Sequence, residues 1–538
     1  MNFKSIQRIA LLAILCAIYT DGLAQHAGWH LKDKQVDDYW GISLDKAYSF
    51  LKSTGRKPQQ VIVGVIDSGI DTAHVDLKNV LWVNPKDLTR NGEDEDKNGY
   101  KDDVHGWNFI SNRDGGSVTK DSYELARFYW TYKTRFETLS LDKVKRKDRQ
   151  KFVEWQRAQK EINRLSNTES AKSTRERFDV FVKGDSIISK AIGKDIFTVA
   201  DLALYKEEDT RTSGFVGLFA SYGNKEGQSG LTNRAFLEGM GAFFGIEKAT
   251  MGTKPPVEYR KMVLDDKYDD IKDKYYGSGI LLTNAKSAEH GTHVAGIIAA
   301  ERNNEIGIDG VADQVRILAV RAIPDGDEHD KDVALAIRYA VDRGAKVINM
   351  SFGKAFSPDK KWVDEAVKYA QKKGVLLVHA AGNDAKNVDE IPVYPTAYLL
   401  SGKKITNWIT VGASGDPKLG NLAAHFSNYG KNKVDVFAPG VQIYSTFPGV
   451  NPYASLDGTS MAAPIVSGIA ALLLSYYPEL TAVQVKHIIE KSVRIPDAPV
   501  FIPGQKESVS LHQLCRTGGI VNAFDAVQLA EKIVKQGK

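Results

Sequence analysis

Short runs of apolar, largely β-branched residues recur along the chain, and each is typical of a strand buried on both faces. Five runs have this character: VIVGVID (61–67), VRILAV (315–320), KVINMS (346–351), GVLLVHAA (374–381) and NWITVGA (407–413). Helical spacing of apolar positions appears between them, in VALAIRYAVDRG (333–344) and WVDEAVKYAQKKG (362–374). This alternation predicts an α/β fold with a mostly parallel central sheet. Ligands of such sheets bind beyond the carboxyl ends of the strands, so the residues after each strand are the first candidates for chemistry.

The alternation breaks off between residues 115 and 280, where the pattern predicts a largely helical insertion. The stretch 122–139 has one apolar helical face, formed by Leu125, Phe128, Tyr129, Tyr132, Phe136 and Leu139. The next segment, 142–151, holds six basic and two acidic residues, which is typical of a solvated face. Helical spacing resumes over 152–165, so a helical hairpin is one way for the insertion to open.

Residues 1–24 have the three-part pattern of a secretory signal peptide. Two basic residues precede a short apolar run, and small residues before the end favour cleavage after Ala24. The run is too short to span a bilayer, so we expect export to the periplasm or the medium without stable membrane insertion. Removal of the leader removes Cys16 and leaves Cys515 alone, which excludes an internal disulfide.

Composition and charge add little to this picture. The 538 residues are 42% hydrophobic and 26% charged, as in an ordinary soluble protein. A net charge of +5 is weak for this length and gives no case for nucleic acid as a partner. The sequence carries no indication of the oligomeric state. The expected organisation is a lead-in over 25–60, a main domain over 61–530 that contains the insertion, and a tail over 531–538.

Four polar residues stand where a strand ends or a helix begins: Asp67, His290, Asn383 and Ser460. Each alone has an ordinary structural explanation, such as a cap, a turn residue or a half-buried histidine. Ser460 opens a nearly all-apolar helix, where free N–H groups and the helix dipole stabilise negative charge. Together the four supply a nucleophile, a base, a residue that orients the base and an oxyanion donor. A metal site at His290 and His293 would need further ligands, and none is evident, so His293 is interpreted as structural.

The sequence blocks around these residues resemble those of the subtilisin-like serine proteases, the subtilases. IDSGID, HGTHVAG, NMSFG, AAGN and GTSMAAP occur in the family's order, with Asp before His before Ser. FSNYG (426–430), DVFAPG (435–440) and GGIVNAFDAV (518–527) also resemble subtilase segments. The match covers roughly 61–110 and 280–530 and leaves out the insertion. The resemblance implies the three-layer, subtilisin-like α/β fold.

The resemblance also implies a serine endopeptidase that hydrolyses peptide bonds through an acyl-enzyme intermediate. Asp67 would orient His290, and His290 would take the proton of Ser460 as that hydroxyl attacks the peptide carbonyl. Asn383 and the backbone N–H of Ser460 would hold the oxyanion. No cofactor is required for this chemistry, and the expected partners are protein or peptide substrates.

Two segments are similar to the family's substrate-binding segments. Ser351, Phe352 and Gly353 match the strand that pairs with substrate backbone, with Phe352 where the family more often has Leu. Ala381 and Gly382 would line the pocket for the primary side chain. Binding through extended backbone pairing is largely tolerant of substrate sequence.

The loop NGEDEDKNGYKDD (91–103) is similar to the first half of a calcium-binding loop, with oxygen ligands at alternating positions and then a glycine. The expected ligands are Asp94, Asp96, Asn98, Tyr100 through its carbonyl, and Asp102. The twelfth position, where a bidentate Glu is usual, is His105. A structural Ca²⁺ and a metal-free acidic surface turn are therefore both open interpretations.

Only about 36 residues separate Ala24 from the first strand, too few for the compact folding prodomain that many subtilases carry. Because the insertion lies between Asp67 and His290 in the sequence, we hypothesise that it covers the cleft or assists folding. Two other classes stay open: a catalytically silent subtilase-like binding protein, and a calcium-dependent surface module suggested only by the loop 91–103.

Overall fold

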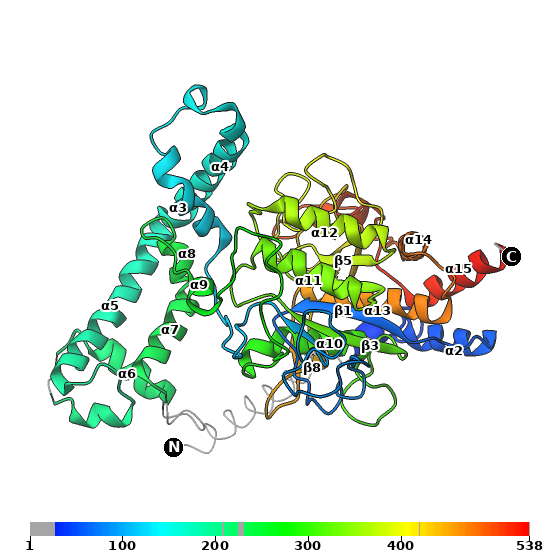
Figure 1. Ribbon diagram of the computed structural model, residues 1–538, viewed down its shortest axis with the longest axis horizontal. Coiled ribbons are helices and arrows are strands. Elements are labelled where there is room, and N and C mark those ends of the chain that lie inside the picture. Colours follow the sequence, from blue (N-terminus) through cyan, green and yellow to red (C-terminus); the bar gives the residue numbers. More distant parts are fainter. Residues whose placement is uncertain (1–26, 207–208, 224–230, 419, 537–538) are drawn as a thin grey trace, which may run out of the picture. The chain divides into compact units, whose positions relative to one another are not determined.

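The chain divides into two compact units, each with a hydrophobic core of its own (Figure 1). Unit 2 comprises Ser122–Val257, and unit 1 comprises the segments on either side of it. The computed structural model describes residues 27–206, 209–223, 231–418 and 420–536. The expected signal peptide, 1–24, lies outside the described residues.

A seven-stranded sheet in the order β2-β3-β1-β4-β5-β6-β7 forms the centre of unit 1, and every pairing in it is parallel. The strands are β1 (Val61–Asp67), β2 (Gly106–Asn108), β3 (Val315–Arg321), β4 (Val347–Met350), β5 (Leu376–Ala380), β6 (Trp408–Ser414) and β7 (Val436–Pro439). Most strand residues are buried, as their uninterrupted apolar runs predicted. The carboxyl ends of the strands meet at one edge, where Asp67 is the register partner of Arg321.

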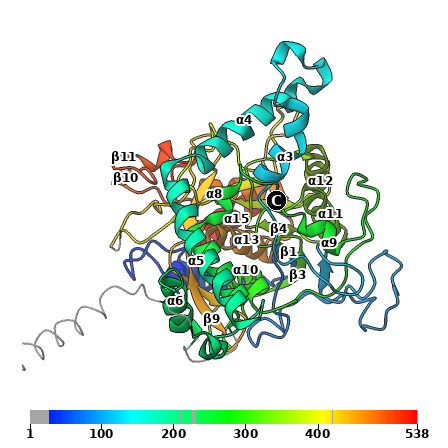
Figure 2. The same cartoon turned by 90° about the vertical axis from the view of Figure 1, so that its left-hand side faces the viewer.

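Helices cover both faces of this sheet and complete a three-layer α/β fold (Figures 1 and 2). One face is covered by α11 (Asp330–Asp342) and α12 (Lys360–Lys372). The other face is covered by α2 (Leu44–Thr54), α10 (Glu289–Ala299), α13 (Thr459–Tyr476), α14 (Ala482–Lys491) and α15 (Ala523–Gln536). Alternate residues of β1 serve different cores, since Val63 and Val65 face the α13 side and Ile66 faces the α11 side. The predicted subtilisin-like fold class is confirmed.

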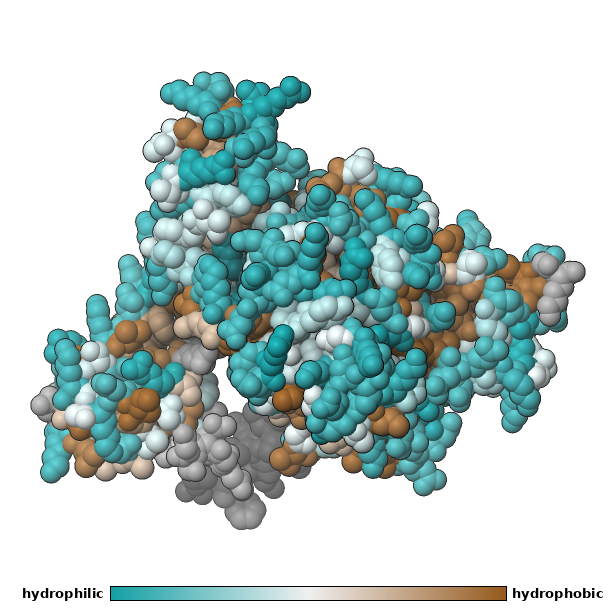
Figure 3. Space-filling model, viewed as in Figure 1, coloured by the Kyte–Doolittle hydropathy of each residue, from teal (hydrophilic) through white to brown (hydrophobic). Residues whose placement is uncertain are grey.

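Helix α13 is buried along almost its whole length. Within the described ranges it is the one helix long and apolar enough to cross a membrane, but 89% of that window is buried inside the protein. It is therefore the central core helix of unit 1. The face of the molecule seen in Figure 3 is mainly hydrophilic, in keeping with the high content of charged residues.

The described part of the lead-in, 27–60, belongs to the core of unit 1. Trp29, Ile42 and Leu51 are buried in the same cluster as α10 and α13. The Nε1 of Trp29 donates to the carbonyl of Val441 over 3.1 Å, and the backbone N–H of Ala523 donates to Ile42 over 2.8 Å. This segment was expected only to be a lead-in, although the buried residues Leu44, Ala47 and Leu51 of α2 have helical spacing.

Unit 2 is built from helices, and no strand is assigned within its described residues. Its described α-helices are α3 (Glu124–Phe136), α4 (Arg149–Ser166), α5 (Glu169–Ile192), α6 (Ser213–Gly223), α7 (Asn233–Phe244) and α8 (Ile246–Thr250). The first two pack against each other through Phe136, Phe152 and Trp155, so the insertion does open with a helical hairpin. A separate aromatic cluster around Phe215 and Phe219 forms the core beneath α5 and α6.

The insertion was expected to span 115–280, but the second compact unit is shorter at both ends. The flanking segments obtain their partners inside unit 1. Ser278 forms a bridge with Asn108 of β2, and buried Arg260 donates to Asp332 of α11 over 2.9 Å. A change of sequence pattern shows where the strand–helix alternation stops, but it does not show which neighbours a loop will bind.

The remaining elements of unit 1 are short. They are the two-stranded ladders β8 (Ile443–Thr446) with β9 (Tyr453–Leu456) and β10 (Val500–Phe501) with β11 (Ser508–Val509), the helix α9 (Tyr259–Val263), and the 3-10 helices η1 (Trp29–Leu31), η5 (Lys286–Ala288) and η6 (Leu511–Gln513).

Candidate active site

Asp67 and His290, which are 223 positions apart, form a hydrogen-bonded pair at the carboxyl edge of the sheet. The Nδ1 of His290 donates to the Oδ1 of Asp67 over 2.7 Å, and the backbone N–H of Ser68 donates to the same oxygen over 2.7 Å. Asp67 is buried, whereas 38% of the His290 side chain is exposed. Gly291 permits this approach, because a β-carbon there would lie 2.2 Å from the carbonyl oxygen of Gly69. The carboxylate therefore holds one ring nitrogen and leaves Nε2 for another partner.

Two opposing effects set the pKa of His290. Burial lowers this pKa, whereas the charge of Asp67 and its hydrogen bond raise it, and the net result lies above the ordinary value for histidine. His293 differs, because burial lowers its pKa to about 4 and its Nε2 lies 3.0 Å from the carbonyl of Ala454. His290 is thus the histidine of this helix that is suited to accept a proton, and His293 has a structural environment.

Ser460 is the second residue of α13, and its side chain is half-buried. Its hydroxyl donates to the carbonyl of Ser351 over 3.1 Å, and among the described residues no hydrogen bond joins it to His290. The helices that carry the two residues are neighbours, since α10 packs against α13 in one core. Rotation about the Cα–Cβ bond of Ser460 is the movement that redirects its hydroxyl.

Asn383 is held by Thr459, the residue before the serine. The Oδ1 of Asn383 accepts from both the backbone N–H and the hydroxyl of Thr459, each over 2.9 Å. These bonds leave the Nδ2 group of Asn383 without a partner among the residues that the structure describes. A β-carbon placed on Gly458 would lie 3.5 Å from this Nδ2 and 3.5 Å from the backbone N of Ser460. Two N–H donors therefore border one small space beside Ser460.

A chain of hydrogen bonds ties the start of α13 to β4. The Oγ of Ser467 donates to Asn349 over 2.9 Å, and the Nδ2 of Asn349 donates to the Oγ of Ser351 over 2.9 Å. Ser351 in turn donates to the carbonyl of Ser460 over 2.8 Å. Ser467 and Asn349 are fully buried, so this chain fixes the position of the serine backbone from inside the core.

The two predicted substrate segments leave the sheet side by side, because β4 and β5 are adjacent parallel strands. Ser351, Phe352 and Gly353 follow β4, whereas Ala381 and Gly382 follow β5. Gly382 has a φ of +100°, and a β-carbon there would lie 2.4 Å from the Nδ2 of Asn428. Only glycine suits this position.

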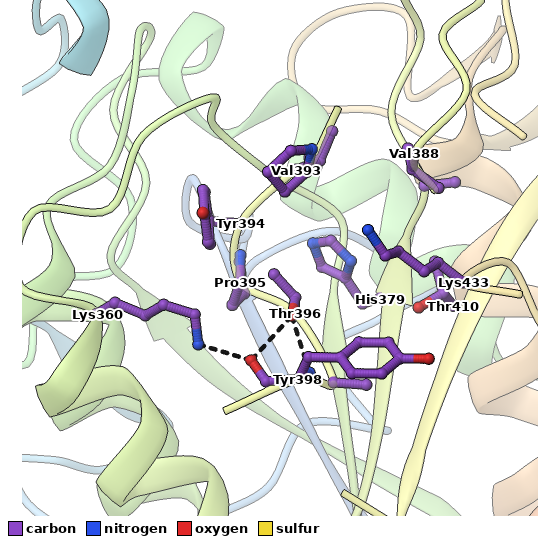
Figure 4. A pocket seen from close by; sticks show the side chains of 13 residues that line it. Lys360, His379, Val388, Val393, Tyr394, Pro395, Thr396, Tyr398, Thr410 and Lys433 are labelled. Atoms are coloured by element: carbon purple, nitrogen blue, oxygen red, sulfur yellow. Dashed lines mark hydrogen bonds between the residues drawn. The ribbon is translucent and has the colours of Figure 1, made fainter. Parts of the chain in front are cut away.

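A cavity of about 170 Å³ lies next to the second segment, and Ala381 is one of the residues that line it. Figure 4 shows other side chains of its wall, among them Val393 and His379. The lining of this cavity does not include Ser351, Gly353 or Gly382.

Arg321, which sequence reasoning missed, is buried at the end of β3. Its Nη1 donates to the carbonyl of Ser68, after Asp67, and over 3.3 Å to that of Ser287, before α10. Burial lowers the pKa of Arg321 to about 10, and the charge of Asp67 opposes that effect. The guanidinium thus joins the two segments that carry the acid and the histidine.

Sequence reasoning also missed the supporting roles of Thr459, Asn349, Ser467 and Asn428. Asn428 donates to the carbonyl of Ala381 over 2.9 Å and accepts from the backbone N–H groups of Asp384 and Lys386. The block FSNYG, which contains Asn428, was the available signal for it. Nothing in the sequence indicated which polar atoms of the other three would face the site.

The predicted calcium ligands use their oxygens mainly on backbone N–H groups. Asp94 accepts from Asn98 and Gly99, and Asp102 accepts from the backbones of Asn91 and Gly92. Asp96 accepts from the backbone of Asn98, and its other oxygen lies 3.1 Å from Arg343. The Tyr100 ring packs against Trp107 and Tyr339. Within the described ranges, no group of three or more His, Cys, Asp or Glu residues is arranged to hold a metal ion.

Asp87, beside this loop, is fully buried, and both of its carboxylate oxygens lack a hydrogen-bond partner among the described residues. Burial and the neighbouring Glu95 raise the pKa of Asp87 to about 7, and burial raises that of Asp103 to about 6. A carboxylate in this position is costly without a cation. Two of the predicted ligands, Asp94 and Asp96, meet at the backbone N–H of Asn98, and Asp87 adds a buried carboxyl group beside the loop.

The parallel sheet between two helical layers, with this set of side chains at its carboxyl edge, defines a subtilisin-like α/β protein. The chain belongs to the subtilase family, since the Peptidase S8 model, described as "Subtilase family", matches residues 58–518. The family predicted from the sequence blocks is confirmed.

Curated relatives support this assignment over part of the chain. The chain is 48% identical over 187 residues to a protein named thermophilic serine proteinase from Bacillus sp. (strain AK1), covering 35% of this chain and 42% of that protein. It is 42% identical over 213 residues to thermitase from Thermoactinomyces vulgaris, covering 39% of this chain and 70% of thermitase. The match thus spans less than half of the Bacillus protein. Among solved structures, a protease from Pseudoalteromonas arctica PAMC 21717 is similar with a TM-score of 0.47 and 19% identity, covering 94% of this chain and 98% of that one.

Proposed function

We propose that this protein is an exported serine endopeptidase that hydrolyses peptide bonds through Asp67, His290 and Ser460. The observation that carries the proposal is the 2.7 Å hydrogen bond between His290 Nδ1 and Asp67, which leaves Nε2 as the proton acceptor. Family membership supports the reaction class, and the relative from Bacillus sp. (strain AK1) is named a serine proteinase.

The steps follow from the chemistry of these groups. Ser460 rotates its hydroxyl from Ser351 toward His290, gives its proton to Nε2 and attacks the peptide carbonyl carbon. Asp67 stabilises the imidazolium that forms, and the imidazolium protonates the leaving amine. Water then attacks the acyl-enzyme with His290 as the base, which releases the second product and restores Ser460.

Asn383 Nδ2 and the backbone N–H of Ser460 are proposed to bind the oxyanion. Both donors border the space beside Gly458, and Thr459 fixes the Asn383 amide so that its N–H group faces away from Thr459. Donors held in place before the reaction need no reorganisation as charge develops on the oxygen. The segments 351–353 and 381–382 are proposed to bind the substrate backbone and the primary side chain between them.

Labelling with a fluorophosphonate probe tests the proposed chemistry. The parent should label at Ser460, and a Ser460→Ala variant with an unchanged melting temperature should not. The same parent should cleave an unstructured protein such as casein. A correctly folded parent that neither labels nor cleaves would be a catalytically silent binding protein, and the proposal would fail.

Export is proposed from residues 1–24. Expression of the full chain in a secreting bacterial host should give extracellular or periplasmic protein whose N-terminus is Gln25. Retention in the cytoplasm with residue 1 intact would contradict export.

We also propose a structural Ca²⁺ at the loop 91–103, held by oxygens of Asp94, Asp96, Asn98, Tyr100 and Asp102, with the buried carboxylate of Asp87 as a further candidate ligand. Calcium should raise the melting temperature of the parent and release heat in a calorimetric titration. Asp94→Asn and Asp87→Asn should each weaken both effects, and a variant that keeps the parent's response would remove that residue from the site. No heat and no rise in melting temperature would exclude the ion.

A further inference from the structure

The cavity of about 170 Å³ beside Ala381 is small for a separate ligand site, since pockets for whole ligands measure about 300–1,000 Å³. Its size suits one side chain. The end of β5 and the loop 392–398 form most of its wall. Figure 4 shows the ring of His379, on β5, among the other lining side chains.

Val393 places this cavity next to both proposed substrate segments. A β-carbon on Gly353 would lie 2.8 Å from the Cγ1 of Val393, and one on Gly382 would lie 4.0 Å from its Cγ2. Val393 also lines the cavity. A substrate side chain that enters between the two glycines therefore meets this space.

The two charged residues of the cavity wall, Lys360 and Lys433, already donate hydrogen bonds to other groups of the protein. Lys360 donates to the carboxylate of Asp364 and, over 2.8 Å, to the carbonyl of Tyr398. Lys433 donates to the carbonyl of Asp389 over 3.0 Å. Because both ammonium groups have these partners, the cavity does not strongly attract an acidic side chain. A basic side chain would be repelled by the same two ammonium groups. The occupant that fits is uncharged.

His379 contributes one nitrogen atom, Nδ1, that has no hydrogen-bond donor as a partner among the described residues. Its Nε2 lies 2.9 Å from the carbonyl oxygen of Phe352, so Nε2 must carry the proton and Nδ1 must carry the lone pair. Burial lowers the pKa of His379 to about 4, which keeps the ring neutral near pH 7. Nδ1 has no hydrogen-bond partner in the described chain. It is nevertheless not one of the fully buried polar atoms, so part of its surface is accessible. It therefore remains open to the cavity.

The two threonine hydroxyls in the wall already take part in hydrogen bonds. The Oγ1 of Thr410 accepts from the indole N–H of Trp408 over 2.9 Å, and the Oγ1 of Thr396 accepts from the backbone N–H of Tyr398 over 2.8 Å. Nδ1 of His379 is thus the ring nitrogen of the wall whose acceptor capacity is unused, and unlike a hydroxyl it can only accept. A buried acceptor of this kind favours an occupant that brings a donor.

We propose that the cavity receives the substrate side chain on the amino side of the scissile bond, and that Nδ1 of His379 accepts a hydrogen bond from it. The preferred substrates are then peptides with an uncharged, donor-bearing residue at that position, such as Tyr, Gln or Thr. This inference rests on the proposed function, because it assigns specificity to the same site.

Matched peptide substrates test the preference directly in the parent enzyme. Three pairs, Tyr against Phe, Gln against Met and Thr against Val, differ little in size and differ in the donor. At pH 7 the donor-bearing member should have the larger kcat/KM in at least one pair, by about 2- to 10-fold, the range of one neutral hydrogen bond. Equal values in all three pairs would overturn the inference even if no variant could be made.

Two variants separate the functions of the two ring nitrogens. His379→Gln places an amide N–H near the position of Nε2, keeps a donor for Phe352 and removes the acceptor at Nδ1. His379→Asn places its oxygen near the position of Nδ1 and loses the donor to Phe352. The donor preference should disappear in His379→Gln and persist in part in His379→Asn. Using the ratio of the two kcat/KM values within each variant cancels any general loss of activity.

Thr410→Val is the matched control, since it removes the other side-chain acceptor at this end of the wall, and its ratio should stay as in the parent. Loss of the preference in Thr410→Val with retention in His379→Gln would assign the acceptor to Thr410 and refute our inference. A preference for Glu over Gln would assign selection to Lys360 or Lys433 and would also refute it. If the parent cleaves no peptide and does not label at Ser460, the proposed function itself has failed.

Discussion

Asp67 uses one of its two carboxylate oxygens for both His290 and the backbone of Ser68, while the other oxygen is buried without a partner in the described chain. Concentrating both bonds on Oδ1 fixes the carboxylate relative to the imidazole ring. The charge then has its main effect on His290, whose pKa it raises against burial. The contribution of Asp67 to the rate of catalysis should therefore depend on its negative charge as well as on its hydrogen bond to His290.

Asp67→Asn keeps the shape and removes the charge. We expect kcat to fall by roughly 10⁴-fold, the loss seen for the same substitution in another serine protease triad. The apparent pKa of the activity profile should also fall, because burial then acts on His290 unopposed. A profile of kcat/KM from pH 5 to 9 measures both changes, and a variant with the parent's activity and profile would remove Asp67 from the mechanism.

The sign of the pH dependence differs between activity and stability. The proposed mechanism needs neutral His290, so activity should rise with pH through a pKa above 6.5. The contribution of the Asp67–His290 pair to the free energy of unfolding has the opposite dependence and decreases as pH rises. It is fully present below the unfolded pKa and is lost as pH rises through the raised folded pKa. Denaturant unfolding of parent and Asp67→Asn across pH 5 to 9 should show a difference that shrinks with increasing pH.

Thr459 acts through Asn383 in this structure, because both of its hydrogen bonds to the amide oxygen orient the free N–H group. Thr459→Val removes the hydroxyl bond and should lower kcat by about 10-fold with little change in KM, less than the roughly 10²- to 10³-fold loss when an oxyanion donor is removed from a subtilisin. In an Asn383→Ala background the same substitution should have almost no further effect on kcat. Additive losses in the double variant would show that Thr459 has a separate role.

At the scale of elements, helix α13 carries Ser460 in its first turn and packs closely against its neighbours further along. Gly468 of this helix faces Val311, and a β-carbon there would lie 2.6 Å from the Cβ of Val311. The first turn of the same helix positions Ser460, so packing in the helix interior and geometry at its start are linked.

Gly468→Ala gains about 1 kcal/mol of helix propensity. The added methyl group overpacks the contact with Val311, which typically costs about 1–3 kcal/mol. We therefore expect a lower melting temperature, measured by calorimetry, and recovery when Val311→Ala is added. Gly239→Ala in α7, where no atom lies within 4 Å of the new carbon, is the control and should not destabilise. A stabilised Gly468→Ala would contradict the close contact.

The expected strands 315–320, 374–381 and 407–413 correspond to β3, β5 and β6, and the helices expected over 333–344 and 362–374 correspond to α11 and α12. Long apolar runs and clear helical spacing made these elements predictable. The three-residue strand β2 was not anticipated, because so short a segment carries little pattern of its own and is stabilised by pairing with β3.

At the scale of the whole molecule, unit 2 begins and ends at neighbouring points. The hydroxyl of Ser122 donates to the carbonyl of Val257 over 2.9 Å, although the two residues are 135 positions apart. An insertion with adjacent ends can be excised without stretching the remaining chain.

Excision of 123–256, with Ser122 joined to Val257 through two glycines, tests whether unit 2 covers the cleft or assists folding, as its place between Asp67 and His290 led us to hypothesise. We expect either faster cleavage of casein relative to a short peptide or a lower yield of soluble protein. Phe219→Ala in the core of unit 2 is the companion variant, since it disturbs that core without removing the unit. If the shortened protein matches the parent in activity and yield, the hypothesis is wrong.

The sequence by itself determined the class of fold, the family and the identity of the polar residues at the strand ends. Apolar runs encode buried strands locally, and the reactive residues lie in short, characteristic blocks. Their catalytic roles stay predictions until labelling and mutation are done.

Only the tertiary structure decided which atoms of those residues meet. Asp67 and His290 are 223 positions apart, and Thr459 and Asn383 are 76 apart. The pairing of a particular oxygen with a particular N–H, the burial of Arg321 and the open nitrogen of His379 all depend on how distant segments pack. Local patterns report the preference of a segment for helix or strand, whereas hydrogen-bond partners and burial are properties of the packed chain.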